Sequence, residues 1–304
     1  MMIERMAAGV GVSPTYIASV ANSASHAYYE FTIKKRDGTN RAICHPSQQL
    51  KALQKWLLKN VIENLPMHEA ASGYRKQKTI FDNAARHATS HFLLRMDFAN
   101  FFPSITENDL RVYIRKTLAL FSAWNRDDIE IFCRLVCKDS RLTIGAPTSP
   151  AISNVICFDM DSEISDLASK HGITYTRYAD DLFFSTSTPD VLRQFQVLVE
   201  DLVTNLALPA NLDLNRRKTK HSSKRGARRV TGIVLGSDGK AHIGRALKRR
   251  IRGMIYRIEL LDPAARSSLA GLIAYAMGFD RRFLNKLITK YGHATIMRAR
   301  KPDT

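Results

Sequence analysis

Two adjacent aspartates stand between two short runs of β-forming residues, in the segment Tyr178-Ala179-Asp180-Asp181. The flanking residues, Tyr175 to Arg177 and Leu182 to Phe184, favour strands, so we expect the pair at the tip of a tight hairpin. Two carboxylates at such a tip repel each other, and divalent cations would relieve that repulsion. An ordinary acidic turn is the alternative, because Asp is common in turns.

A third carboxylate, Asp97, closes the apolar run His91 to Met96, which predicts a buried strand. An isolated charge at the end of a buried strand is costly unless it is paired. If this strand lies beside the hairpin of Asp180 and Asp181, three carboxylates converge. Such a set can hold two Mg²⁺ ions, one that activates an attacking hydroxyl and one that stabilises a departing pyrophosphate.

The chain is strongly basic, with 46 basic and 28 acidic residues and a net charge of +18. Such a surplus disfavours a compact protein through self-repulsion, and nucleic acid is the partner that most often uses it. A basic membrane-surface protein is the alternative, which only a weak amphipathic stretch at residues 245–257 supports. Because we find neither a long apolar run nor a signal-peptide block in Met1 to Val20, we expect a cytoplasmic protein without a membrane partner.

Apolar spacing predicts helices together with antiparallel hairpins, which indicates an α+β fold. Helices are expected at 12–22, 50–65, 80–90, 107–120, 126–136, 149–168, 191–206 and from 245 onward. Strands are expected at 28–33, 41–44, 91–98, 173–178, 182–187, 230–235 and 241–243, with turns at Arg36-Asp37-Gly38 and Asp238-Gly239. The cysteines lack a complete set of zinc ligands, so we interpret all four as buried, reduced thiols: Cys44, Cys133, Cys137 and Cys157.

Five motifs, which follow one another along the chain in the order and with the spacing of a known family, resemble the motifs of that family. The palm of reverse transcriptases is similar in three places: Asp97 with Phe101-Phe102, Gly145-Ala146-Pro147-Thr148-Ser149-Pro150 with Asn154, and the Tyr178 to Asp181 segment. Bacterial retron reverse transcriptases carry motifs similar to Asn83-Ala84-Ala85-Arg86-His87 and Val230-Thr231-Gly232. One position departs from the family, because Ile144 stands where Gln is usual, and Ile offers no polar contact near a nascent base pair.

The resemblance implies a right-hand polymerase with fingers, palm and a helical thumb. The expected division is an N-terminal helical segment at 1–27, fingers at 28–90, palm at 91–235 and a basic thumb at 236–304. It implies RNA-directed DNA synthesis from deoxynucleoside triphosphates with two Mg²⁺ ions, or Mn²⁺ in their place. In retrons the template is a cognate structured non-coding RNA, the primer is a guanosine 2′-hydroxyl of that RNA, and the DNA product stays joined to it.

The resemblance also assigns roles to the residues of the palm. Asp97, Asp180 and Asp181 would be catalytic and hold metal, with Phe98 beside them, and Lys218 would assist the leaving pyrophosphate, with Lys220 as its alternative. Phe102 would select deoxynucleotides by a clash with the ribose 2′-hydroxyl, whereas a core Phe is the simpler interpretation. The residues expected to bind the nucleotide are Lys35 (or its neighbour Lys34), Arg41, Phe98, Phe102, Gly145 and Tyr178.

Further candidates concern nucleic acid and partner proteins. The residues expected to bind nucleic acid are Asn83, His87, Arg245, Lys248, Arg249 and Arg252. The family's setting adds anti-phage defence and an effector protein as expectations. Two other functions remain open at this point: a group II intron-like or diversity-generating reverse transcriptase, and a non-catalytic RNA-binding module with the same fold.

Overall fold

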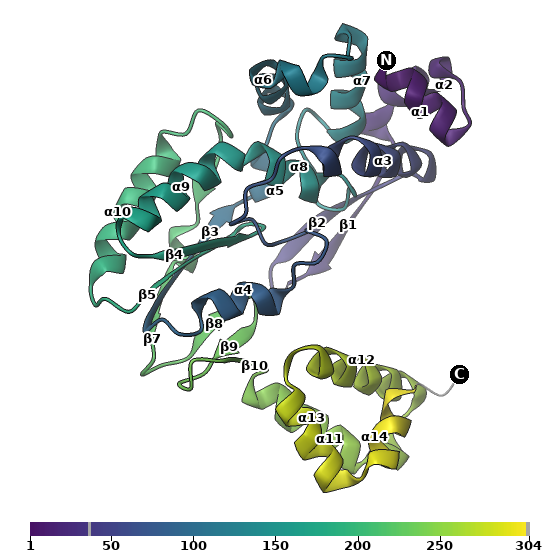
Figure 1. Ribbon diagram of the computed structural model, residues 1–304. Helices are drawn as coiled ribbons and strands as arrows, with labels where there is room; N and C mark the ends of the chain where they lie inside the picture. Colours follow the sequence, from purple (N-terminus) through teal and green to yellow (C-terminus); the bar gives the residue numbers. More distant parts are fainter. Residues whose placement is uncertain (36–37, 302–304) are drawn as a thin grey trace. The chain divides into compact units, whose positions relative to one another are not determined.

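The computed structural model describes residues 1–35 and 38–301, which fold as two compact units (Figure 1). Unit 1 comprises residues 1–78 and 92–221, and unit 2 comprises residues 79–91 and the chain from 222 onward. Helices and antiparallel strands occur together, so the predicted α+β class is confirmed. Residues 79–91 and 222–235 group with the C-terminal helices, whereas the boundaries of fingers, palm and thumb stay a prediction.

Unit 1 contains most of the chain's helices and its longest strands. Its α-helices are α1 (Met2–Val10), α2 (Pro14–Asn22), α3 (Gln48–Asn60), α5 (Phe101–Ser104), α6 (Glu107–Lys116), α7 (Arg126–Val136), α8 (Ser149–Ile156), α9 (Phe158–Lys170) and α10 (Val191–Thr204). Its 3₁₀ turns are η1 (Ala24–His26), η2 (Ile62–Asn64), η3 (Leu118–Phe121) and η4 (Arg216–Lys218). Its strands are β1 (Tyr28–Lys34), β2 (Asn40–Pro46), β3 (Phe92–Ala99), β4 (Thr174–Tyr178), β5 (Asp181–Thr186) and β6 (Asp213–Leu214), and β7 (Lys220–Ser223) crosses the boundary between the units.

The central sheet of unit 1 has the strand order β4-β5-β3-β6, and every pairing along that order is antiparallel. Strands β3 and β5 are buried on both faces, as their apolar runs predict. Helices α9 and α10 lie side by side against the sheet (Figure 1). The strands β1 and β2 form a separate antiparallel hairpin, and Arg36 and Asp37 of its predicted turn lie outside the described residues.

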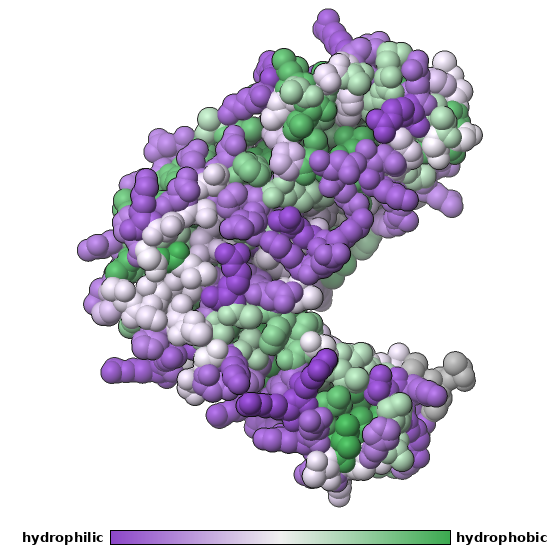
Figure 2. Space-filling model, in the orientation of Figure 1, coloured by the Kyte–Doolittle hydropathy of each residue, from purple (hydrophilic) through white to green (hydrophobic). Residues whose placement is uncertain are grey.

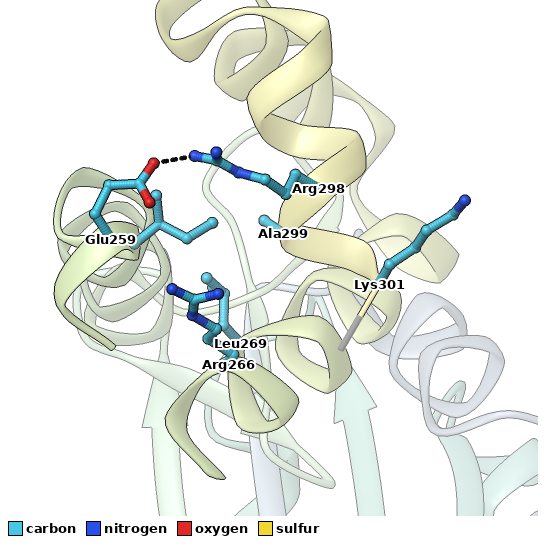
Figure 3. Close-up of a pocket in the computed structure, with 7 residues that line it drawn as sticks. Glu259, Arg266, Leu269, Arg298, Ala299 and Lys301 are labelled. Atoms are coloured by element: carbon cyan, nitrogen blue, oxygen red, sulfur yellow. Dashed lines mark hydrogen bonds and ion pairs between the residues drawn. The ribbon is translucent and has the colours of Figure 1, made fainter. Parts of the chain in front are cut away.

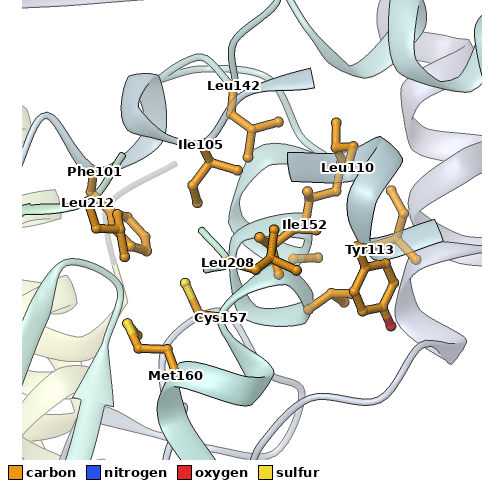
Figure 4. Close-up of a cluster of buried hydrophobic side chains, with 14 of the residues drawn as sticks. Phe101, Ile105, Leu110, Tyr113, Leu142, Ile152, Cys157, Met160, Leu208 and Leu212 are labelled. Carbon is orange, nitrogen blue, oxygen red and sulfur yellow. The ribbon is translucent and has the colours of Figure 1, made fainter. Parts of the chain in front are cut away.

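The hydrophobic core of unit 1 joins the sheet to helices far apart in sequence. Figure 4 shows its centre, where side chains from the segment after β3 meet those of α6, α8 and α9. Cys133, Cys137 and Cys157 are buried free thiols, as predicted. The prediction is wrong for Cys44, which is free but partly exposed because it lies on β2 of the protruding hairpin.

Unit 2 combines a small sheet with a helical C-terminal part and has a core of its own. Its elements are α4 (Ile80–His87), β8 (Arg228–Val230), β9 (Ile233–Leu235), β10 (Ala241–His242), α11 (Arg245–Tyr256), η5 (Ile258–Leu260), α12 (Pro263–Phe279), α13 (Arg281–Tyr291) and α14 (His293–Arg300). Helix α4 packs on the sheet β10-β9-β8. None of the helices in the described part of the chain combines the length and hydrophobicity needed to cross a bilayer.

Two predicted elements are divided in the structure. The expected strand 230–235 is two strands, because Thr231 and Gly232 both have a positive φ, 48° and 87°, and form a tight hairpin turn. The expected helix 149–168 is divided at Cys157, although its hydrogen bonds continue through the division. Four other helices end earlier than predicted: α3 at Asn60, α4 at His87, α6 at Lys116 and α10 at Thr204.

Candidate active site

Three aspartates meet at one end of the central sheet of unit 1. Asp97 of β3 is directly opposite Asp181 of β5 in the strand register, and Asp180 immediately precedes Asp181. The Phe98 amide donates to the Asp180 carbonyl at 3.0 Å, which ties the hairpin tip to β3. The convergence that the sequence predicted conditionally is therefore present.

The hairpin tip is short and conformationally restricted. Tyr178 pairs with Asp181, so only Ala179 and Asp180 connect β4 to β5, and Ala179 is left-handed with a φ of 56°. Gly73 packs against this tip, because a Cβ at position 73 would lie 2.9 Å from the Ala179 amide nitrogen. The tip is thus held by a neighbouring loop as well as by its own strands.

Two cations neutralise part of the aspartate charge. Lys218 Nζ lies 2.7 Å from Asp97 Oδ1, and Arg95 donates from Nε and Nη2 to Asp181 Oδ1 at 2.9 and 2.7 Å. Burial raises the pKa of Asp181 to about 6, where Arg95 opposes the rise and the other two aspartates add to it. Burial and the charge of Asp97 raise the pKa of Asp180 as well. Burial is thus the main reason that both carboxyls hold a proton more tightly than usual, and the neighbouring carboxylates add to it.

These residues fit divalent cations in their donor chemistry. Carboxylate oxygens are the ligands that Mg²⁺ and Mn²⁺ prefer, and three of them lie on adjacent strands. Across residues 1–35 and 38–301, no group of three or more acidic, thiol or imidazole side chains is arranged so that it could hold a metal ion as it stands. The side chain of Phe98 is buried, so only its main-chain atoms are available to an ion.

Aromatic rings surround the aspartates in unit 1. Phe101 is buried and Phe102 is half-buried, as expected if one of the two faces inward. The Tyr74 ring lies 6.4 Å from that of Phe102 and 6.1 Å from that of Tyr178. Burial, and after it the charge of Asp180, raises the pKa of Tyr74. Tyr74 was not among the predicted site residues, and its only signal in the sequence is an aromatic residue after Gly73 in an unpatterned loop.

The β1–β2 hairpin contributes basic side chains and a close approach to Gly145. Arg41 is exposed, and its charge opposes the rise in the pKa of Asp180. It lies opposite Ile33 in the strand register. Because side chains alternate along a strand, Lys35 shares that face and Lys34 does not. Gly145 has a φ of 120°, and a Cβ there would lie 2.6 Å from the Cys44 carbonyl oxygen. Ile144 holds β2 through its main chain, since its carbonyl accepts from the Cys44 amide at 2.8 Å.

Asn83 and His87 of α4 lie inside unit 2. Their side chains are 1% and 0% exposed, so direct contact with nucleic acid, as predicted, is inconsistent with the structure. Burial and neighbouring Arg86 lower the pKa of His87 to about 3, which keeps the ring neutral at physiological pH. The Thr231 hydroxyl donates to the Ile80 carbonyl, so the Val-Thr-Gly turn is joined to the first turn of α4. The two retron-like motifs therefore pack together.

Four basic residues of α11 share one face at helical spacing and line a cavity of about 440 Å³: Arg245, Lys248, Arg249 and Arg252. Lys248 is partly committed within unit 2, because its Nζ lies 2.6 Å from Asp280 Oδ2. Hydrophilic residues cover much of the visible surface of the C-terminal helices (Figure 2). The three arginines are exposed and available to a polyanion.

A smaller pocket in unit 2 is lined by charged residues from three helical segments (Figure 3). Its volume is about 40 Å³, which is too small for a nucleotide. Arg298 pairs with Glu259 across it. The acidic partner is already neutralised, so we assign no catalytic role to this pocket.

Comparison with known proteins identifies the family. Residues 33–235 match the model of the reverse transcriptase (RNA-dependent DNA polymerase) family. The chain is 34% identical to the retron Ec83 reverse transcriptase of Escherichia coli over 281 residues, which covers 90% of each chain. The chain belongs to the retron reverse transcriptases. It is also 29% identical to the retron Ec86 reverse transcriptase of Escherichia coli, covering 98% of this chain and 93% of that one.

Solved structures show the fold of this retron reverse transcriptase independently of sequence. An apo telomerase from Candida tropicalis superposes with a TM-score of 0.50 at 12% identity. The match covers 87% of the present chain and 57% of the telomerase chain, so the chain corresponds to little more than half of that protein. The palm fold predicted from the motifs is confirmed, and the family as a whole uses divalent metal ions.

Proposed function

We propose that this RNA-directed DNA polymerase of the retron type uses Asp97, Asp180 and Asp181 to hold two Mg²⁺ ions. The observation that carries the proposal is the register of β3 and β5, which sets Asp97 opposite Asp181 with Asp180 adjacent. Two bound ions would activate the attacking hydroxyl and stabilise the departing pyrophosphate. Mn²⁺ has the same preference for oxygen ligands and is the expected substitute.

The protein's own residues orient the nucleotide around these carboxylates. Arg41 and Lys35 supply positive charge for the triphosphate, which suits a bidentate guanidinium and a point charge respectively. Phe102, Tyr178 and Gly145 form the walls around the sugar and base of the nucleotide. Phe98 contributes main-chain atoms to the same site. Lys218, which lies 2.7 Å from Asp97, is a donor for the departing pyrophosphate.

The template in this proposal is a cognate structured RNA, and a guanosine 2′-hydroxyl of that RNA starts synthesis. The exposed arginines of α11 would bind its phosphates, which gives affinity without sequence readout. Kinship with retrons also supports a cytoplasmic role in anti-phage defence beside an effector protein. Asn83 and His87 would act here by shaping unit 2 around the Val-Thr-Gly turn.

The test supplies purified protein with RNA from its native locus, labelled deoxynucleotides and Mg²⁺. We expect a DNA product that resists alkali and becomes shorter when its RNA is removed. An Asp180→Asn, Asp181→Asn variant should make none, whereas Asp159→Asn with Asp166→Asn, two exposed acids of α9, should behave as wild type. Extension of a generic annealed primer alone would contradict the retron-type template, and tight RNA binding without synthesis would contradict polymerase activity.

A further inference from the structure

A fully buried ion pair lies directly behind the two-aspartate turn and has no role in the chemistry above. Arg177 of β4 donates from Nε and Nη2 to Asp161 of α9, at 2.8 Å to Oδ1 and 2.6 Å to Oδ2. Both side chains are 0% exposed. The Tyr175 hydroxyl donates to the same Asp161 Oδ1 at 2.7 Å.

We propose that Arg177, held by Asp161, is a positioning residue that fixes the turn carrying Asp180 and Asp181 in its metal-binding geometry. The inference rests on the metal role proposed above for those aspartates. Its direct support is a third hydrogen bond, from Arg177 Nη1 to the Ala179 carbonyl at 3.2 Å. One guanidinium thus connects the helix behind the sheet to the turn itself.

The turn requires such support because its backbone is unfavourable. Ala179 has a φ of 56°, and a left-handed non-glycine residue costs roughly 1–2 kcal/mol. Conformations of this kind persist only where the surroundings over-determine them. The Arg177 guanidinium also lies 5.9 Å from the ring of Phe101, in the segment that follows Asp97. Arg177 therefore contacts both the turn that carries Asp180 and Asp181 and the segment that follows Asp97.

The main chain of Arg177 is held as firmly as its side chain. Its amide donates to the Ala70 carbonyl at 2.8 Å, and its carbonyl accepts from the Ser72 amide and hydroxyl at 2.7 and 2.9 Å. The next loop residue, Gly73, is the one that packs against the Ala179 amide. Arg177 thus links α9, the 70–73 loop and the turn.

Stability alone does not explain an ion pair at this place. Removing two charges from water costs several kcal/mol per ion, and apolar residues of similar volume are often at least as stabilising. An apolar side chain, however, cannot donate to the Ala179 carbonyl. Lysine has a single ammonium and cannot form the same fork to a carboxylate while reaching a second acceptor. Arg177 is required because its planar guanidinium can bind the Asp161 carboxylate and the Ala179 carbonyl at the same time.

The experiment separates positioning from folding. The variant Asp161→Leu, Tyr175→Phe, Arg177→Met replaces the network with apolar side chains, so no buried charge is left unpaired. Arg177→Lys keeps the charge pair and loses the fork. The matched control is Arg134→Lys, since Arg134 pairs with Glu130 on the exposed surface of α7. Thermal melting, Mn²⁺ binding by electron paramagnetic resonance, and primer extension are measured on all four proteins.

We expect the triple variant to melt within about 5 °C of wild type. Its kcat should fall roughly 10- to 100-fold through misplacement of the turn, with KM for primer–template nearly unchanged. Its Kd for Mn²⁺ should rise severalfold, Arg177→Lys should fall between, and Arg134→Lys should match wild type.

Two results would overturn the proposal. One is a triple variant with wild-type kcat and Mn²⁺ affinity. The other is a loss of activity that disappears when kcat is normalised to folded protein and leaves Mn²⁺ affinity intact. A wild-type protein that binds Mn²⁺ without polymerising, and whose variants bind it more weakly, would instead sink the proposed function and leave the positioning role standing.

Discussion

The three aspartates differ in how closely cations approach them, and that difference governs what a metal must displace. Lys218 lies 2.7 Å from Asp97, and Arg95 lies 2.7 Å from Asp181 and 4.0 Å from Asp97. The charges of Lys218 and Arg41 act on Asp180 from a greater distance. A divalent cation must compete with Arg95 for Asp181. The side chains nearest the chemistry therefore set both the metal affinity and its dependence on pH.

Removal of metal should make the stability of the protein fall as pH rises. Asp181 has an ordinary pKa of 3.8 and a folded-state pKa of about 6, so the folded state binds a proton that the unfolded chain has lost. Its contribution to stability is complete below pH 4 and is lost as pH rises through 6. We expect the melting temperature in a chelator to fall between pH 5 and 7, and added Mg²⁺ to restore more stability at pH 7 than at pH 5.

The variant Asp181→Asn is the control for that prediction, because its side chain does not titrate. It should melt with a weaker dependence on pH and respond less to Mg²⁺. An unchanged pH profile in this variant would mean that another group causes the effect.

The half-buried ring of Phe102 should discriminate between the two classes of nucleotide. Phe102→Val would open space beside Tyr74, so ribonucleotide incorporation should rise roughly 10- to 100-fold relative to deoxynucleotide, as removal of a built-in clash predicts. Primer extension with each nucleotide measures the ratio of kcat/KM values. Phe101→Leu, a change at the buried neighbour, should leave the ratio unchanged, and equal ratios in all three proteins would contradict the prediction.

Elements meet closely where β2 passes the Gly145 segment. A Cβ at position 145 would clash with the Cys44 main chain, and the φ of 120° is unfavourable for alanine. Gly145→Ala should therefore lower the free energy of unfolding by about 2–4 kcal/mol and weaken nucleotide binding. Gly271→Ala is the control, because it lies in helix α12 with open space around it and should stabilise the protein by about 1 kcal/mol. Chemical denaturation measures both, and a neutral Gly145→Ala would show that β2 moves freely.

Helix α4, which carries the Asn83 to His87 motif, and the Thr231-Gly232 turn pack together in unit 2. The left-handed turn needs small or polar residues, and its threonine hydroxyl reaches the first turn of α4. Asn83 and His87 are internal to this cluster, and both side chains are buried and neutral there. The similarity to retron motifs at both places reflects one structural feature of unit 2.

At the scale of the whole molecule, a net charge of +18 predicts RNA binding that weakens steeply with salt. Arg249→Gln and Arg252→Gln should each reduce the slope of log K against log salt by about 1, since each removes one phosphate contact. Arg134→Gln, which removes an arginine of unit 1 already paired with Glu130, should leave the slope unchanged. Titration of labelled RNA at several salt concentrations decides between these outcomes. Unaltered slopes in the α11 variants would exclude that face from the interface.

Motifs in the sequence were sufficient to predict the family and to mark the carboxylates as candidate metal ligands. Metal-dependent nucleotidyl transfer needs carboxylates. Asp97 and the Asp180-Asp181 pair are therefore candidates, because each lies at the end of a predicted strand and neighbouring strands can bring them together. The helix 126–136 was predicted to the residue, because Asn125 caps it and its apolar spacing is regular. Local conformational propensity predicts the helices and strands, and the order of the motifs along the chain indicates the family.

The groups that are distant in sequence but lie around those carboxylates could be identified from the folded structure alone. Lys218 contacts Asp97, although 121 positions separate them in the sequence. Asp161 pairs with Arg177, but in the sequence it looks like one more acidic residue of a helix whose other acids face solvent. The burial of His87, the close approach at Gly145 and the ring of Tyr74 beside Phe102 likewise depend on packing between elements. A linear pattern records which side chains are present, whereas the free energy of burying and pairing them is set by neighbours that the fold alone brings together.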